Sequence, residues 1–488
     1  MSALRHISNF GLAPLAVVVS LGWAMPAQAQ SAGDVAALRA DMAAMRQAME
    51  SMAARVNTLE AQLADANAKA DAASAAAASA NAAAASASTT AIAVRDATKG
   101  VPKVNWKGAP EIEGEGGWSF KPRGRLQIDA GSVSAPSAVK AAANLKNPGG
   151  LGFANEMRRA YLGVDGKIPG GFSYRVEADF ANSGVELTDL YVTYQASKAL
   201  SFTAGQHKPF WGLEEITSDL FTTFNERAAI NTAFGYERRV GLSAAYAKGD
   251  VLVQAGVFTD NAADLNNDEN NSIGYDGRIV FMPKLAGGQL HLGGSVHVRD
   301  LKDSTPGAIP TVQYRVRPFM HTTDTRFIDT GKINATSETG YGLEAAYLRG
   351  PFHFAGETHW QKVSRPGGTN PTFFGGYAEV GYFLTKGDTR GYKGGAFDRT
   401  KPANGADKGG IGAIEVNLRY DYLDLNDAGI TGGKQKGLGV SVVWTPIAYA
   451  RFIANYGRMK YSDAAIITAT GDRDYSVDAM GVRAQFDF

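Results

Sequence analysis

YSVDAMGVRAQFDF, the stretch from Tyr475 to Phe488, decides the fold of this chain. Side chains alternate between the two faces of an extended strand, so this strand has one apolar face and one polar face. The apolar face carries Val482, Ala484, Phe486 and Phe488, and the polar face carries Arg483, Gln485 and Asp487. Such a strand is typical of a closed barrel with lipid outside and water inside. A strand of a soluble β-sandwich is the alternative.

The same alternation fills most of the chain after Gly117. Residues 172–180, 352–361 and 414–422 each alternate apolar side chains with ionisable ones. Closure of these strands into a barrel leaves no unpaired sheet edge, which would cost several kcal/mol per backbone group in hydrocarbon. Repeated charged inner faces predict a water-filled lumen rather than the core of a sandwich.

Connections between the predicted strands alternate in length. Short turns fall near residues 167–171, 197–200, 247–250, 286–288, 349–351 and 445–448, and longer polar connections lie between them. This asymmetry is typical of outer-membrane barrels, with short turns in the periplasm and long loops outside. The connection from Lys386 to Gly410 is the exception, since it is long on the short-turn side.

Seventeen runs resemble strands, whereas a single-chain barrel of this type needs an even number. The turns at Ala286 and Arg349 both belong to the periplasmic side, so we assign Thr311–Met320 to an external loop that folds into the mouth. Sixteen antiparallel strands remain, enough to leave an open channel. The predicted barrel domain covers residues 118–488.

Two segments before the barrel have different compositions. Residues 1–29 predict a secretory signal peptide, with Arg5, an apolar run and Ala27-Gln28-Ala29 as the cleavage site. Residues 30–98 are rich in alanine and predict a periplasmic helix. Residues 99–117, rich in glycine and proline, predict a linker.

The predicted helix carries an a/d heptad pattern over about four repeats. Its seam residues are Val35, Leu38, Met42, Met45, Met49, Met52, Val56, Leu59 and Leu63. Charged residues at the flanking e and g positions have opposite signs in a parallel arrangement. The pattern predicts a self-associating parallel coiled coil; an isolated helix or a low-complexity spacer is the alternative.

Composition excludes several classes of function. The chain has no cysteine, which excludes disulfides and thiolate metal sites. Lys and Arg number 49 against 48 Asp and Glu, so net charge does not indicate nucleic-acid binding. The histidines lack metal-ligand spacing, and no catalytic or phosphate-loop motif is present. We therefore expect no enzyme, no cofactor and no metal site.

The connection from His207 to Glu237 is too apolar for a solvent loop, since it holds four phenylalanines, a tryptophan and a tyrosine. We expect it to fold into the barrel as a constriction; packing at a subunit contact is the alternative. Its charged residues would set a field across the channel. These candidates are Lys208, Glu214, Glu215, Asp219, Glu226 and Arg227.

Three runs in order, starting NEMRRAYLGVDGK, TAGQHKPFWGLEE and GYFLTKGDTRGYK, resemble the phosphate- and polyphosphate-selective porin O and P family. The resemblance covers about residues 118–488. It implies a 16-stranded outer-membrane barrel of a Gram-negative bacterium, a homotrimer, and diffusion of phosphate or other small anions. It also implies a constriction lined by lysines and arginines.

The family's anion-binding residues match this chain in part. Arg158 and Arg159 match its paired arginines, and alternation makes Arg159 the better lumen candidate. Arg315 and Arg317 match the first rungs of its arginine ladder, whereas Phe319 and Thr323 replace later rungs. Glu215 stands where phosphate-specific members have a lysine.

The sequence therefore predicts a trimeric outer-membrane porin for small hydrophilic solutes, with an anion preference. The residues expected to attract anions are Arg158, Arg159, Arg315 and Arg317, opposite an acidic patch at Glu214 and Glu215. A weakly selective general porin is one alternative, favoured by Glu215 and by the neutral charge. A structural protein whose coiled coil links the outer membrane to a periplasmic partner is the other.

Overall fold

The computed structural model describes residues 32–97, 101–146, 151–181, 184–265, 271–303, 305 and 307–488. The predicted signal peptide at 1–29 lies outside these residues. The chain divides near residue 100 into two compact units.

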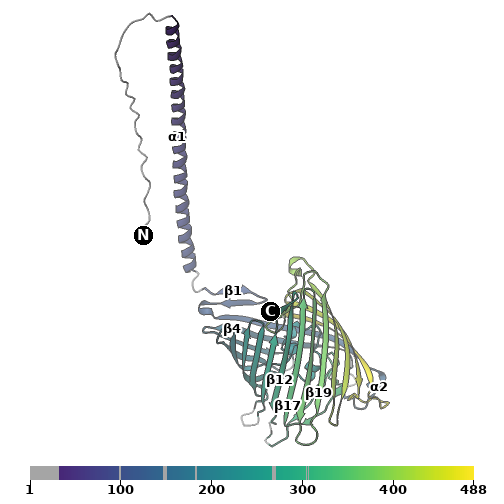
Figure 1. Cartoon of the computed structure of the whole chain (residues 1–488). Helices are drawn as coiled ribbons and strands as arrows, with labels where there is room; N and C mark the ends of the chain where they lie inside the picture. The colour runs from purple at the N-terminus through teal and green to yellow at the C-terminus, as the bar shows by residue number, and fades with distance from the viewer. Residues whose placement is uncertain are drawn as a thin grey trace. The chain divides into compact units, whose positions relative to one another are not determined.

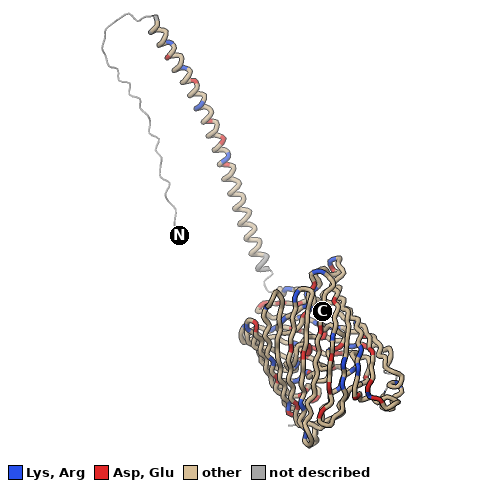
Figure 2. Tube along the Cα trace, turned by 45° about the vertical axis from the view of Figure 1, so that its right-hand side comes forward, with Lys and Arg blue, Asp and Glu red and all other residues tan. Residues whose placement is uncertain are grey.

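The first unit contains α1, an unbroken helix from Ala32 to Ala97. Ten of its twelve charged residues lie between Asp34 and Asp71, and the alanine-rich stretch 72–94 carries no charge (Figure 2). The nine predicted seam residues are all exposed in the single chain, from 39% at Val35 to 64% at Leu38. Of the described helices, none combines the length and the hydropathy needed to cross a membrane.

The second unit is a closed barrel of sixteen antiparallel strands, as predicted (Figure 1). Each strand pairs with the next around the ring, and β25 pairs with β3 to close it. The strands are β3 (Ser119–Ser134), β4 (Gly152–Ile168), β5 (Phe172–Asp179), β6 (Glu186–Gln195), β7 (Leu200–His207), β8 (Arg239–Lys248), β9 (Val251–Phe258), β10 (Ile273–Phe281), β12 (Gly288–Asp300), β17 (Ser337–Arg349), β18 (Phe352–Ser364), β19 (Thr372–Phe383), β22 (Ala413–Asp427), β23 (Ile430–Ile447), β24 (Ala450–Ser462) and β25 (Tyr475–Asp487).

The last strand has the predicted two faces. Val482 and Phe486 are 53% and 47% exposed on the outer surface, whereas Arg483 and Gln485 are each 1% exposed inside the barrel. Burial of the polar face does not come from a packed apolar core. Polar side chains and inward-folded connections cover it instead, which explains how an ionisable inner face can be inaccessible.

The segment from Leu301 to Thr336 lies outside the wall, as predicted. It forms two short pairs, β13 (Thr311–Val312) with β16 (Ile333–Asn334), and β14 (Arg315–Val316) with β15 (Ile328–Asp329). A Cβ at Gly437 or Gly457 on the inner wall would meet the ring of Phe319. This external loop therefore packs into the lumen.

The long connection between β19 and β22 also enters the lumen, from the end where the short turns lie. It contains the hairpin β20 (Gly391–Lys393) and β21 (Ala396–Asp398), followed by η4 (Ala406–Lys408). Arg278 on β10 donates to the carbonyl of Gly395, and the Phe397 amide donates to Thr217. The connection breaks the short-turn rule because it fills part of the barrel.

The predicted linker contains a hairpin. β1 (Lys103–Trp106) pairs with β2 (Pro110–Glu113), and β2 continues onto β3 through Ile112 and Phe120. Gly108 takes a left-handed conformation, φ 82°, at the turn. Gly108 and Pro110, which contributed to the linker prediction, are thus a turn residue and the first residue of β2. The remaining elements are short: η1 (Glu115–Gly117), α2 (Ser137–Lys140), α3 (Leu213–Ile216), η3 (Asp219–Phe221), α4 (Ala229–Ala233) and β11 (Lys284–Leu285).

Candidate functional site

The connection from His207 to Glu237 folds into the barrel as predicted, and polar groups of the wall anchor it. Glu357 on β18 accepts hydrogen bonds from the amides of Leu213 and Glu214, at 2.8 and 2.7 Å. Asp421 on β22 accepts from the Ala229 amide at 2.8 Å. Buried carboxylates thus satisfy the free amides at the starts of α3 and α4. We call residues 208–238 the inward loop.

The inward loop divides the lumen into a filled part and an open part. In the filled part, Trp211 packs against His359, with ring centroids 4.6 Å apart, and Tyr236 stacks on His297 at 3.8 Å. Tyr392 of the β20–β21 hairpin hydrogen-bonds His291 at 2.6 Å. His291, His297 and His359 of the inner wall are therefore covered by the inward loop and the hairpin. No group of three or more His, Asp or Glu in the described ranges could hold a metal ion.

The open part is a cavity of about 1040 Å³ between the inward loop and strands β3 to β9. Eleven Lys or Arg side chains and ten Asp or Glu side chains line it. The cations are Lys121, Arg123, Arg125, Arg158, Arg159, Arg175, Lys208, Arg227, Arg238, Arg317 and Arg399. Charges of both signs therefore line the open route, and their arrangement decides the local field.

Eight of these charged side chains, together with the buried Glu177, which is not part of the lining, form one continuous chain of ion pairs. It begins and ends with arginine and alternates in sign throughout, so it contains five arginines and four carboxylates. The order is Arg159, Asp219, Arg125, Glu177, Arg123, Asp165, Arg175, Asp189, Arg238. We call it the arginine chain. It leaves an excess of one positive charge on this side of the cavity.

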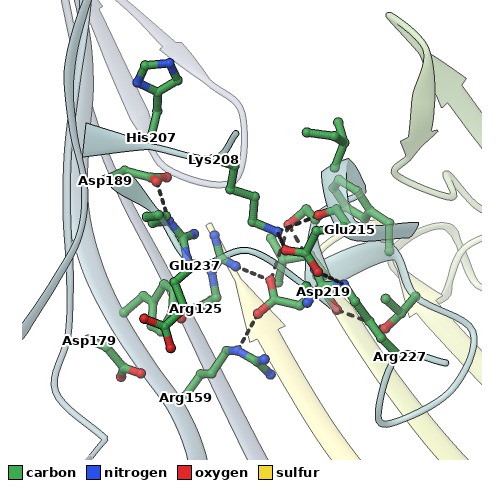
Figure 3. Close-up of a pocket in the computed structure, with 18 of the residues that line it drawn as sticks. Arg125, Arg159, Asp179, Asp189, His207, Lys208, Glu215, Asp219, Arg227 and Glu237 are labelled. Atoms are coloured by element: carbon green, nitrogen blue, oxygen red, sulfur yellow. Dashed lines mark hydrogen bonds and ion pairs between the residues drawn. The ribbon is translucent and has the colours of Figure 1, made fainter. Parts of the chain in front are cut away.

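A second group, Lys208, Glu215 and Arg227, lies on the inward loop itself (Figure 3). Lys208 Nζ is 2.9 Å from Glu215 Oε1, and Arg227 Nε is 3.7 Å from Glu215 Oε2. We call these residues the loop triad. Two cations against one carboxylate again leave an excess of one positive charge.

Burial and neighbouring charges shift the pKa values of the loop residues. Burial and the adjacent Arg227 lower the pKa of Lys208 to about 8, although Glu215 opposes this shift. Burial alone would raise the pKa of Glu215, but Arg227 and Lys208 outweigh it and hold that pKa below its usual value. Arg125 and Arg159 likewise overcome burial and hold the pKa of Asp219 well below its usual value.

Arg158 and Arg159 both line the cavity, although alternation made Arg159 the better lumen candidate. A β-bulge explains the difference: Gln127 faces Arg159 and Ile128 faces Met157, so Arg158 is the extra residue of β4. Arg158 pairs with Glu226 at 3.0 Å, and Arg159 pairs with Asp219 at 2.5 Å.

Arg315 and Arg317 do not share a face. Arg317 lines the cavity and pairs with Asp324 at 2.8 Å, whereas Arg315 is exposed and is not part of the lining. The strand that would have aligned them, β14, ends at Val316, and Phe319 then turns the backbone with a φ of 54°. The structure thus brings only Arg317 of this pair to the cavity.

Glu214 and Glu215 point to different surroundings because consecutive residues of a helical turn are about 100° apart. Glu215 lines the cavity, but Glu214 faces the wall and is not part of the lining. Its carboxylate pairs with Arg419 at 2.6 Å and accepts from Asn231 at 2.7 Å. The acidic patch expected from both residues therefore does not form.

Several cavity residues lay outside the sequence-based candidates. On β3, Arg123, Arg125 and Gln127 follow one another at intervals of two residues and so share one face. On β5, Arg175 and Glu177 share a face in the same way. This spacing was a usable signal for a lumen-facing pair. Arg238 and Arg399 had no such signal, since both lie in connections between wall strands, and only the folded chain defines the paths of these connections.

Comparisons with known proteins agree with the barrel. The family model for phosphate-selective porin O and P matches residues 120–488. A protein of Caulobacter vibrioides, described only as "Uncharacterized protein", is 46% identical over 394 residues, 79% of this chain and 77% of that protein. Porin O of Pseudomonas aeruginosa is 28% identical over 421 residues, 76% of this chain and 89% of that protein. Among solved structures, an anion-selective porin from Comamonas acidovorans matches with a TM-score of 0.49 at 13% identity, over 76% of this chain and 100% of that chain.

Proposed function

The chain belongs to the phosphate-selective porin O and P family, and on that premise we propose that its cavity conducts small anions by passive diffusion. A barrel of this family is an outer-membrane porin, a channel protein rather than an enzyme.

The distribution of charge at the inward loop is the observation that carries the anion preference. Over the whole lining, eleven cations face ten carboxylates, which is close to balance. The arginine chain and the loop triad each carry one positive charge in excess, two in total. A low-dielectric wall focuses this local excess on ions in the channel, so anions are favoured over cations.

The proposal is tested by the reversal potential of the full-length porin in a planar bilayer across a KCl gradient. We expect the sign that corresponds to chloride permeating faster than potassium. A reversal potential of the opposite sign contradicts an anion channel. The observation that the relative from Pseudomonas aeruginosa is named a porin supports the channel but not a particular solute.

We also propose that the porin is a homotrimer. One side of the barrel supports a subunit contact, because β5, β7 and β9 have eight residues each, against 15 and 18 in β22 and β23. Spanning the hydrocarbon core requires about 9 to 11 residues per tilted strand. A neighbouring subunit would shield the shorter strands from lipid. Cross-linking of the porin in membranes should give trimers.

The exposed seam of α1 supports the proposal that three copies associate through a periplasmic coiled coil. In this arrangement the predicted signal peptide directs export, and the helix is periplasmic. Deleting residues 31–98 tests the role of the helix. Loss of trimers makes the helix an assembly device, whereas loss of envelope attachment with intact trimers and conductance makes it a tether to a periplasmic partner.

A further inference from the structure

Glu215 occupies a place suited to a free anion. Its carboxylate lies on the cavity between two cations of the same loop, Lys208 and Arg227 (Figure 3). Its side chain retains 11% exposure to the cavity. Small oxyanions present to a protein the same chemistry as this carboxylate, negative oxygens that accept from ammonium and guanidinium groups.

The two cations are held in place by backbone groups, not only by Glu215. Lys208 Nζ donates to the carbonyl of Glu215 at 2.5 Å. Arg227 donates from Nε to the carbonyl of Glu214 at 3.0 Å and from Nη2 to the carbonyl of Thr217 at 2.9 Å. Removing the charge of the Glu215 side chain leaves these hydrogen bonds intact. The positions of both cations are therefore preorganised.

We propose that Lys208 and Arg227 form a binding site for small oxyanions, such as sulfate or phosphate, that the porin occupies with its own Glu215 carboxylate. This inference rests on the proposed conduction of anions and concerns selectivity within it. A carboxylate on the same loop competes at a high effective concentration, so free anions do not displace it. Anions then pass the loop triad without a long-lived bound state, and the current does not saturate.

Asp219 occupies a similar position between Arg125 and Arg159, but it is a poorer candidate for a carboxylate that occupies an anion-binding site. It pairs closely with both arginines, whereas the contact between Glu215 and Arg227 is longer, at 3.7 Å. Asp219 is also an internal member of the arginine chain, so its loss would break the chain. Glu215 makes no ion pair beyond the loop triad in the described part of the chain.

Glu215→Gln tests the inference because the amide keeps the size of the side chain and removes its charge. Single-channel chloride current in dilute KCl is titrated with sulfate at about pH 6, where Lys208 is protonated and sulfate is a dianion. We expect wild-type current to show no saturable block. The variant should show saturable block, with a half-blocking sulfate concentration at least about tenfold below any found for wild type.

Glu237→Gln is the matched control. Glu237 is an exposed carboxylate on the same loop and lines the same cavity, but no cation pairs with it among the residues that the structure describes. The Glu237→Gln substitution removes the same charge without exposing a binding site, so sulfate should not block the chloride current of this variant saturably. Adding Lys208→Gln to Glu215→Gln should abolish the block. Glu215→Ala is the second variant if the amide fails to fold, and the same block is expected.

Two results would overturn the inference: a folded Glu215→Gln porin whose current is not blocked, or equal block in Glu237→Gln, which would indicate a general change of field. The reversal potential of the wild type separates this failure from failure of the proposed function. A wild-type anion preference with no block in the variant removes only the site. A wild-type cation preference removes the proposed function itself.

Discussion

Raising the pH from about 7 to about 9 should reduce the anion preference of this porin, because Lys208 loses its proton over that range. Its pKa is about 8. The protonated fraction therefore falls from about 0.9 to about 0.1. The pKa of Glu215 is lowered, so its carboxylate stays ionised over this range. Guanidinium groups do not lose their proton in proteins. The loop triad then carries no net charge instead of one excess positive charge. The combined excess of the loop triad and the arginine chain therefore falls from two to one.

The size of the effect follows from Coulomb's law. A unit charge about 7 Å from a permeating ion contributes about 0.6 kcal/mol in water, close to RT. Loss of this charge disfavours anions and favours cations, and dissolved salt screens both effects. We expect the chloride-to-potassium permeability ratio to fall about threefold, with its midpoint near pH 8.

The assay is the reversal potential across a KCl gradient, measured at closely spaced pH values with the same porin. Lys208→Arg keeps its charge and should show no step, and Lys208→Gln should start at the low ratio and remain there. A wild-type ratio that is constant over this range, or a step that persists in Lys208→Arg, would refute the assignment of the charge to Lys208.

Three further predictions concern other parts of the molecule. Arg159→Glu changes the excess charge at the inward loop from two to zero, so the permeability ratio measured from the reversal potential should approach that of a nonselective channel; an unchanged ratio contradicts this. Arg419→Ala removes the only ion-pair partner of the buried Glu214 among the described residues, and one of the two partners of Glu379. It should destabilise the refolded barrel by about 3–5 kcal/mol in denaturant titrations, whereas Arg458→Ala, at an exposed pair, should cost under about 1 kcal/mol. The chain lacks cysteine, so Met52→Cys on the seam should form disulfide-linked chains in oxidised membranes, and Ala54→Cys on the opposite face should not; equal cross-linking of both contradicts the coiled coil.

Individual residues show how far sequence reasoning reached into the site. Alternation placed Arg483 inside and Phe486 outside correctly, because the period of two is a property of the strand itself. It favoured Arg159 over Arg158 as the lumen residue, yet both line the cavity, since a single bulge moves one residue out of the alternation. Glu214 and Glu215 are neighbours of the same type, and no sequence pattern separates the one that faces Arg419 from the one that faces the cavity.

The amino-acid sequence by itself determined the barrel, its sixteen strands, the long N-terminal helix and the inward course of the connection from His207 to Glu237. These features follow from local periodicity and composition, which act between residues close together in the chain. Only the tertiary structure decided which charges meet. The arginine chain joins residues from four strands and from the inward loop, up to 94 positions apart as in Arg125 and Asp219. Ion pairing depends on distances of a few ångströms, and these distances exist only after the inward loop has settled against the closed wall.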